Sequence, residues 1–149
     1  MKLYVLNGPN LNFLGIREPK HYGTETYANL IEKLTRYADA KGVEMVCRQS
    51  NHEGDLVDWI QEAYWEGADG IVINPGAYTH TSIALLDAVK SVSIPTVEVH
   101  ISKLETREAF RQISYVREAC IATISGHGTD GYTEAIDLLL AHKEQETKA

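Results

Sequence analysis

Glu98 and His100 stand two residues apart in the apolar stretch Thr96–His100, so in a strand their side chains point to the same side. A carboxylate beside an imidazole orients the ring and favours its charged form, which can then donate a proton. A buried histidine paired with a structural glutamate would show the same spacing. The pattern therefore indicates either a general acid or a structural pair, and the spacing does not separate the two.

Arg17 and Tyr22 lie in NGPNLNFLGIREPKHYG, the segment from Asn7 to Gly23. This segment is far longer than the typical connection of about 4–6 residues in a compact domain. A phenol is a poor base unless its anion is stabilised, and a nearby guanidinium, which is always protonated, would favour that anion. A surface arginine and a tyrosine ring packed at the next helix would explain the same residues, and the residues alone favour this second interpretation.

Other common chemistries lack their motifs. No GxGxxG or Walker A motif follows the first apolar run, which argues against a dinucleotide or triphosphate site. The six histidines show no HxxH or HExxH spacing, so we expect no metal, and no GxSxG marks a serine nucleophile. An imine with a carbonyl substrate would need a desolvated lysine, and the surroundings of Lys103, the nearest lysine after His100, do not predict one.

The 149 residues suit one globular domain, residues 1–149, with 23% charged and 44% hydrophobic residues. The net charge of −7, without a Lys/Arg cluster, argues against nucleic acid or an anionic membrane as partner. Cys47 and Cys120 are expected to be buried reduced thiols. No signal peptide and no apolar run of about 18 residues is evident, so we expect a cytoplasmic protein without a membrane anchor.

Apolar strands alternate with helices along the chain. Strands are expected at Leu3–Leu6, Val43–Arg48, Gly70–Asn74, Thr96–His100 and Ala119–Ile124. Helices are expected from Thr26 to Gly42, over 55–65, from about Ser82 to Val92, over Thr106–Gln112 and over Thr133–His142, followed by a polar, fraying tail at 143–149. This alternation predicts an α/β fold, a flavodoxin-like three-layer sandwich with a five-stranded parallel sheet in the order 2-1-3-4-5.

Polar residues follow every expected strand, and in such sheets ligands bind beyond the carboxyl ends of the strands. These segments are NGPNLN after the first strand, then Ser50–Gly54, Asn74–Gly76, His100–Ser102 and Ser125–Gly128. Asn, Gly and Ser are also ordinary turn residues, so one segment alone is a weak signal. Their recurrence at one edge of the sheet predicts a polar cleft there.

Five motifs together resemble one family, the type II 3-dehydroquinate dehydratases. They are NGPNLNxLGxREPxxYG, SNHEG, INPGAYTHTS, VEVHIS and REAFR, and they span nearly the whole chain. The resemblance implies conversion of 3-dehydroquinate to 3-dehydroshikimate and water by anti elimination through an enolate, without a metal or an organic cofactor. It also implies a step of the shikimate pathway or of quinate catabolism, and a homododecamer built from four trimers.

The resemblance assigns roles to residues by motif. Tyr22 matches the base, Arg17 the lid arginine that holds Tyr22 ionised, and His100 the general acid. Glu98 matches the carboxylate that orients His100, and Asn10 the residue that places a water against the enolate oxygen. The substrate-binding positions implied are Asn74, His80, Asp87, Ile101, Ser102 and Arg111, and a lid is implied over about residues 13–23.

One of these implied roles belongs to backbone groups, and another belongs to a side chain from a neighbouring subunit. Ile101 and Ser102 match positions whose backbone N–H groups meet the substrate carboxylate, and Asp87 matches an acid that reaches the site from a neighbouring subunit. The chain departs from the family pattern at 103–106, at 117–118 and at His127. The first departure follows the carboxylate-binding positions, so substrate affinity or a subunit contact could differ.

Two further functions fit the same fold. A flavodoxin-like electron carrier would bind flavin through hydroxyl groups after the first strand, but Asn7–Asn10 contains none. A relative that keeps the fold but has lost activity would have a damaged set of site residues, whereas Tyr22, Arg17 and His100 are all present.

Overall fold

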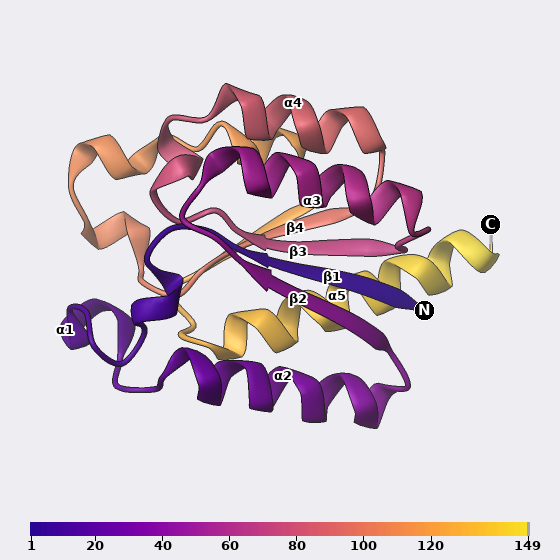
Figure 1. Ribbon diagram of the computed structural model, residues 1–149, viewed down its shortest axis with the longest axis horizontal. Helices are drawn as coiled ribbons and strands as arrows, with labels where there is room; N and C mark the ends of the chain where they lie inside the picture. Colours follow the sequence, from indigo (N-terminus) through magenta and orange to yellow (C-terminus); the bar gives the residue numbers. More distant parts are fainter. Residues whose placement is uncertain (149) are drawn as a thin grey trace.

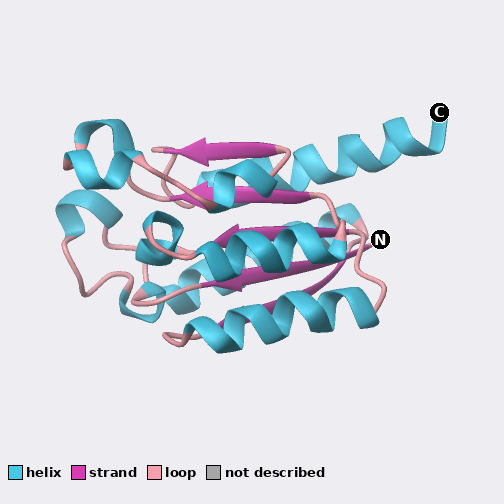
Figure 2. Ribbon diagram, turned by 90° about the horizontal axis from the view of Figure 1, so that it is seen from above, coloured by secondary structure: helices cyan, strands magenta, loops and turns pink. Residues whose placement is uncertain are grey.

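The five strands form one parallel sheet in the order β2-β1-β3-β4-β5, which confirms the predicted topology. The computed structural model describes residues 1–148 of the chain. All the strands run the same way, and their arrowheads point toward the end of the molecule where loops and short helices gather (Figure 2). The strands are β1 (Lys2–Asn7), β2 (Glu44–Gln49), β3 (Gly70–Asn74), β4 (Thr96–His100) and β5 (Ala122–Ser125).

Long helices cover both faces of the sheet (Figure 1). The helices are α1 (Pro19–Tyr22), α2 (Tyr27–Lys41), α3 (Glu53–Trp65), α4 (Ile83–Val92) and α5 (Asp130–Lys148). Because side chains alternate along a strand, Leu3 and Val5 pack in the core formed with α2 and α5, whereas Tyr4 and Leu6 pack with α3 and α4. The three layers predicted from the sequence are therefore present.

Helix α2 begins and ends where its sequence signals predict. The Thr26 side chain accepts a hydrogen bond from the backbone N–H of Asn29, and the Asn29 side chain accepts one from the N–H of Thr26. This reciprocal capping box satisfies N–H groups that the first helical turn leaves free. Gly42 ends the helix at φ 69°, in the left-handed region that glycine adopts without strain.

The segment after β4 differs from the predicted single helix over Thr106–Gln112. It forms two short 3₁₀ helices, Leu104–Thr106 and Ala109–Gln112, because the backbone is extended at Arg107 and Glu108 between them. Another 3₁₀ helix, Val116–Ala119, occupies residues before β5, so this strand begins at Ala122 rather than at Ala119.

Helix α5 continues to Lys148, past the predicted end at His142. The added residues contain neither Gly nor Pro, and most are good helix formers. Lys143 also donates a 3.0 Å hydrogen bond to Asp69, which ties this part of the helix to the start of β3. The predicted end of the helix was therefore too early, and Ala149, the last residue of the predicted tail, lies outside the described residues.

Cys47 and Cys120 are free thiols that lie partly buried on opposite faces of the sheet. Burial raises the pKa of both thiols to about 12, so each stays protonated near neutral pH. In residues 1–148, no helix combines the length and the apolar character that crossing a membrane requires.

Candidate active site

The turns after β1 and β3 pack directly against each other at the carboxyl edge of the sheet. The N–H of Gly8 donates a 2.8 Å hydrogen bond to the carbonyl oxygen of Asn74. A Cβ atom at Gly8 would lie 2.5 Å from the carbonyl oxygen of Pro75, so only glycine fits this approach. The close contact brings the polar residues that follow the two strands to one place.

A cavity of about 160 Å³ lies at this edge. Most of the side chains assigned from the sequence line it, namely Asn10, Arg17, Tyr22, Asn74, His80, His100, Ile101, Ser102 and Arg111. Residues from the turn after β1, from β3, from β4 and from the segment before α2 thus contribute to a single pocket, as the polar strand ends predicted. Glu98 lies behind this set, fully buried beneath His100, and Asp87 is exposed on α4, outside the cavity lining.

Two arginines donate hydrogen bonds to the phenolic oxygen of Tyr22. Arg17 Nη2 lies 3.1 Å from Tyr22 Oη and Arg107 Nη1 lies 3.0 Å from it. The Arg17 guanidinium also stacks on the ring, with its Cζ 4.0 Å from the ring centroid. Both hydrogen bonds are charge-assisted, which is the stronger kind. Arg17 is therefore not a free surface side chain.

The second arginine is more enclosed than the first. The side chain of Arg107 is 4% exposed, against 24% for Arg17. Arg107 Nη1 also donates a 3.1 Å hydrogen bond to Ser102 Oγ. Arg17 Nη2 instead donates a second hydrogen bond, of 3.3 Å, to Glu18 Oε2. Arg107 therefore supplies a fixed charge from the body of the protein, and Arg17 supplies one from the segment before α1.

Glu98 and His100 form a buried pair on β4, as the spacing of two predicted. A ring nitrogen of His100, Nε2, lies 2.5 Å from Glu98 Oε2. The other donors to Glu98 are Thr79 Oγ1 at 2.5 Å, Ser114 Oγ at 2.9 Å and Thr123 Oγ1 at 3.2 Å. Burial alone would raise the pKa of this carboxyl, but the hydrogen bonds from His100, Thr79 and Ser114 outweigh it and lower the pKa to about 2. The carboxylate therefore stays charged and holds the imidazole in place.

Glu98→Gln is expected to weaken the acid sensitivity of the fold. The pKa of Glu98 falls from its ordinary 4.5 to about 2 on folding, so its ionised form stabilises the protein above pH 4.5. This contribution is lost as the pH falls toward 2, and it amounts to at most about 3 kcal/mol. Urea unfolding at several pH values should show a steeper loss of stability for the parent chain than for the variant. Parallel losses in both proteins would contradict the shift.

His80 and Arg111 have partners that fix their orientation. His80 Nδ1 lies 2.6 Å from the carbonyl oxygen of Ile113, and a carbonyl only accepts, so Nδ1 carries the hydrogen. Burial lowers the pKa of His80, which favours the neutral ring. Arg111 Nε donates a 2.5 Å hydrogen bond to Glu108. With its hydrogen on Nδ1, the neutral His80 ring leaves Nε2 as an acceptor for the cavity, whereas Arg111 offers its remaining guanidinium N–H groups as donors.

Residues 1–140 match the family model described as dehydroquinase class II. The chain belongs to the class II dehydroquinase family. This membership agrees with the resemblance seen in the sequence motifs and with the sheet order of the structure.

Relatives with assigned names support the same membership. A protein of Rhodopseudomonas palustris (strain BisA53) named 3-dehydroquinate dehydratase is 55% identical over 139 residues, which cover 93% of this chain and 92% of that one. One of Clostridium perfringens with the same name is 51% identical and covers 95% and 97%. The crystal structure of type II dehydroquinase from Butyrivibrio crossotus matches with a TM-score of 0.92 and 56% identity, and the match covers 93% of this chain and 97% of that one.

Arg107 is the site residue that reasoning from the sequence missed. It stands in the REAFR motif of this class II dehydroquinase, but only Arg111 of that motif was assigned a role. Arg107 lies 85 residues from Tyr22 along the chain, so no local spacing connects them. The sequence signal that could have identified Arg107 as a site residue is its place in the REAFR motif.

Of the departures from the family pattern, the stretch 103–106 reaches the cavity through Leu104, and the others lie outside the cavity lining. Neither Lys103 nor His127 belongs to the cavity lining, so Lys103 is not positioned for an imine with a bound ligand. Arg117 Nε lies 3.9 Å from Glu98 Oε1, on the opposite oxygen from His100. In the described part of the chain, no three His, Cys, Asp or Glu side chains cluster as a metal site would require.

Proposed function

We propose that this chain is a 3-dehydroquinate dehydratase, a hydro-lyase that converts 3-dehydroquinate to 3-dehydroshikimate and water. The observation that carries the proposal is the Tyr22 oxygen held by Arg17 and Arg107 in the same cavity as the His100–Glu98 pair. An elimination needs a base and an acid at one substrate, and this cavity offers a candidate for each. Family membership and the names of the relatives support the substrate.

In the proposed mechanism, ionised Tyr22 takes the proton from the carbon next to the ketone. The electron pair of that C–H bond forms an enolate, and Asn10 places a water against the enolate oxygen. The enolate then collapses, the C–O bond of the hydroxyl breaks, and His100 donates the proton that lets it leave as water. Tyr22 has gained one proton and His100 has lost one, so transfer through solvent restores both for the next turnover.

Charge stabilisation is divided between two parts of the site. Arg17 and Arg107 stabilise the negative charge on Tyr22 before the proton is taken, and Glu98 stabilises the protonated form of His100. The substrate carboxylate meets the backbone N–H groups of Ile101 and Ser102. The remaining binding positions are Asn74, His80 and Arg111, and the segment over about residues 13–23 acts as the lid.

We also propose that the cytoplasmic enzyme is a homododecamer of four trimers, in which Asp87 reaches the site of a neighbouring subunit. Asp87 is exposed and outside the cavity of its own chain, which supports this role. Three large apolar side chains are also exposed, as is typical of an interface. They are Phe110 at 64%, Ile83 at 56% and Ile113 at 56%. Light scattering should give a mass twelve times that of the chain, and a fully active monomer would contradict the assembly.

The activity is tested directly by adding 3-dehydroquinate to the purified protein. The conjugated enone of the product absorbs in the ultraviolet, so turnover appears as a rise in absorbance. A folded protein that gives no rise would overturn the proposal. Borohydride added during turnover should trap no covalent adduct, and an adduct at Lys103 would indicate imine chemistry instead.

A further inference from the structure

A buried polar chain connects the cavity to helix α5. Asn74 Nδ2 donates a 2.9 Å hydrogen bond to Tyr132 Oη, and Tyr132 Oη donates a 2.6 Å hydrogen bond to Asn7 Oδ1. Tyr132 and Asn7 are fully buried, and Asn74 is 3% exposed. Of the three, Asn74 lines the cavity, whereas Tyr132 lies in the first turn of α5, behind the sheet edge.

The two hydrogen bonds of the Asn74 amide fix its orientation. Its Oδ1 accepts from the backbone N–H of Gly76 at 3.1 Å, while its Nδ2 donates to Tyr132. An amide turned by 180° would place NH₂ against the N–H of Gly76, where two donors would face each other. One N–H of Asn74 remains uncommitted by these bonds, and it is available to a ligand in the cavity.

Tyr132 can hold the Asn74 amide at any accessible pH, because its hydroxyl does not titrate in that range. Burial raises the pKa of Tyr132 well above its ordinary value, so it remains a phenol. The single hydroxyl hydrogen is directed to Asn7, which leaves the oxygen lone pairs as acceptors for Asn74. The direction of each hydrogen bond in the chain is thereby determined.

We propose that Tyr132 is a positioning residue for substrate binding, which acts by holding the Asn74 amide with one N–H directed at the ligand. The inference rests on the proposed function, since it adds a residue to the binding side of that site. Tyr132 makes no contact with the cavity itself, so its effect must pass through Asn74. An interaction made equally in the bound and transition states changes KM and leaves kcat unchanged.

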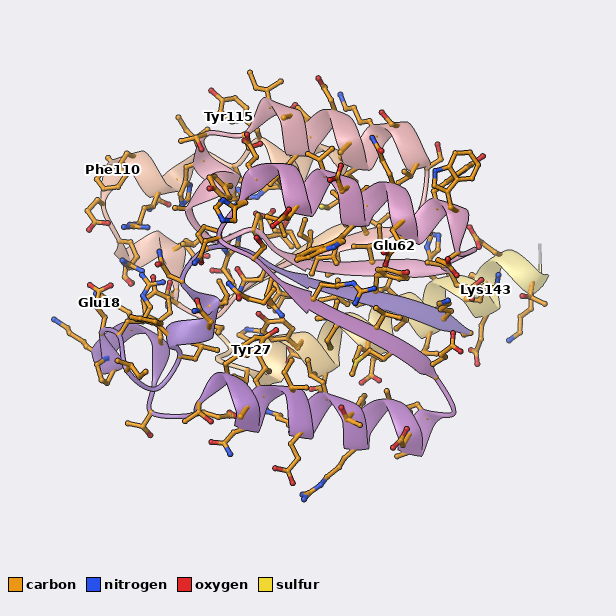
Figure 3. All side chains as sticks on the ribbon, viewed as in Figure 1. Glu18, Tyr27, Glu62, Phe110, Tyr115 and Lys143 are labelled. Carbon is orange, nitrogen blue, oxygen red and sulfur yellow. The ribbon has the colours of Figure 1, made fainter. Side chains whose placement is uncertain are left out.

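Tyr132→Phe should raise KM for 3-dehydroquinate by about tenfold and leave kcat within about twofold. Tyr4→Phe is the control for removal of a buried phenol hydroxyl, because Tyr4 is 2% exposed and its hydroxyl donates one partly buried 2.8 Å hydrogen bond to Glu62, outside the cavity lining. Glu62 lies well away from the end that carries Glu18 and Phe110 (Figure 3). The control should keep the KM of the parent. A Tyr132→Phe variant with the parent KM would overturn the proposal.

Two further measurements separate positioning from general loosening. In an Asn74→Ala background, adding Tyr132→Phe should cause no further rise in KM, and an additive rise would contradict action through Asn74. A crystal structure of Tyr132→Phe should show the Asn74 amide rotated or in more than one orientation. If the parent chain fails to turn over 3-dehydroquinate, the proposed function fails. Independently of that result, an Asn74 amide that keeps its orientation in the crystal structure of Tyr132→Phe would overturn the positioning role.

Discussion

Tyr22→Phe is expected to lower kcat by roughly 10²- to 10⁴-fold, the usual contribution of a general base. The substitution removes only the oxygen to which Arg17 and Arg107 donate, at 3.1 and 3.0 Å. The ring remains, so the packing of Tyr22 against the core on the α2 and α5 face should survive. Steady-state assays of the enone absorbance would measure the loss, and circular dichroism would check the fold.

Tyr37→Phe provides the control for removal of a partly buried phenol. The Tyr37 hydroxyl bonds to Asp137, at 2.6 Å, so it joins α2 to α5 and takes no part in the cavity. This variant should keep the parent kcat. If Tyr22→Phe also kept full turnover, another group would have to be the base, and the central assignment of the mechanism would be wrong.

The strands and the sheet order could be predicted because their signals are local. A short apolar run such as Gly70–Asn74 predicts a strand covered on both faces of a parallel sheet, and all five of its residues are buried. The pairing of Glu98 with His100 follows from the period of two along a strand. The order of strands then places the polar strand ends at one edge, so the location of the cavity could be predicted as well.

The remaining features depend on contacts between distant segments. Whether Arg17 meets Tyr22 depends on how the segment before α2 folds back, and the residues alone favoured a surface arginine until the family motifs reversed that interpretation. The break at Arg107 and Glu108 is an extended backbone between two 3₁₀ turns, which apolar periodicity does not encode. Tyr132 reaches Asn7 across 125 residues, and no sequence spacing points to that hydrogen bond.

Arg107→Gln is expected to lower kcat by about 10²- to 10³-fold, the cost of removing a preorganised donor to a charged oxygen. Arg107 Nη1 has two hydrogens, and the structure directs one to Tyr22 Oη and the other to Ser102 Oγ. Glutamine carries no charge, so Tyr22 would keep only Arg17, which also contacts Glu18. KM should rise too, because Ser102 stands at a proposed carboxylate-binding position.

Arg107→Lys separates the charge from the geometry of this contact. Lysine keeps a positive charge but lacks the planar fork of the guanidinium, so it should recover part of the kcat lost in the glutamine variant. Arg36→Gln on the exposed side of α2, where the side chain is 77% exposed, should change neither constant. Because Arg107 is 4% exposed, thermal unfolding must accompany the kinetics. A folded Arg107→Gln enzyme with the parent kcat would show that Arg17 alone sustains the charge on Tyr22, and the second arginine would then be a binding residue only.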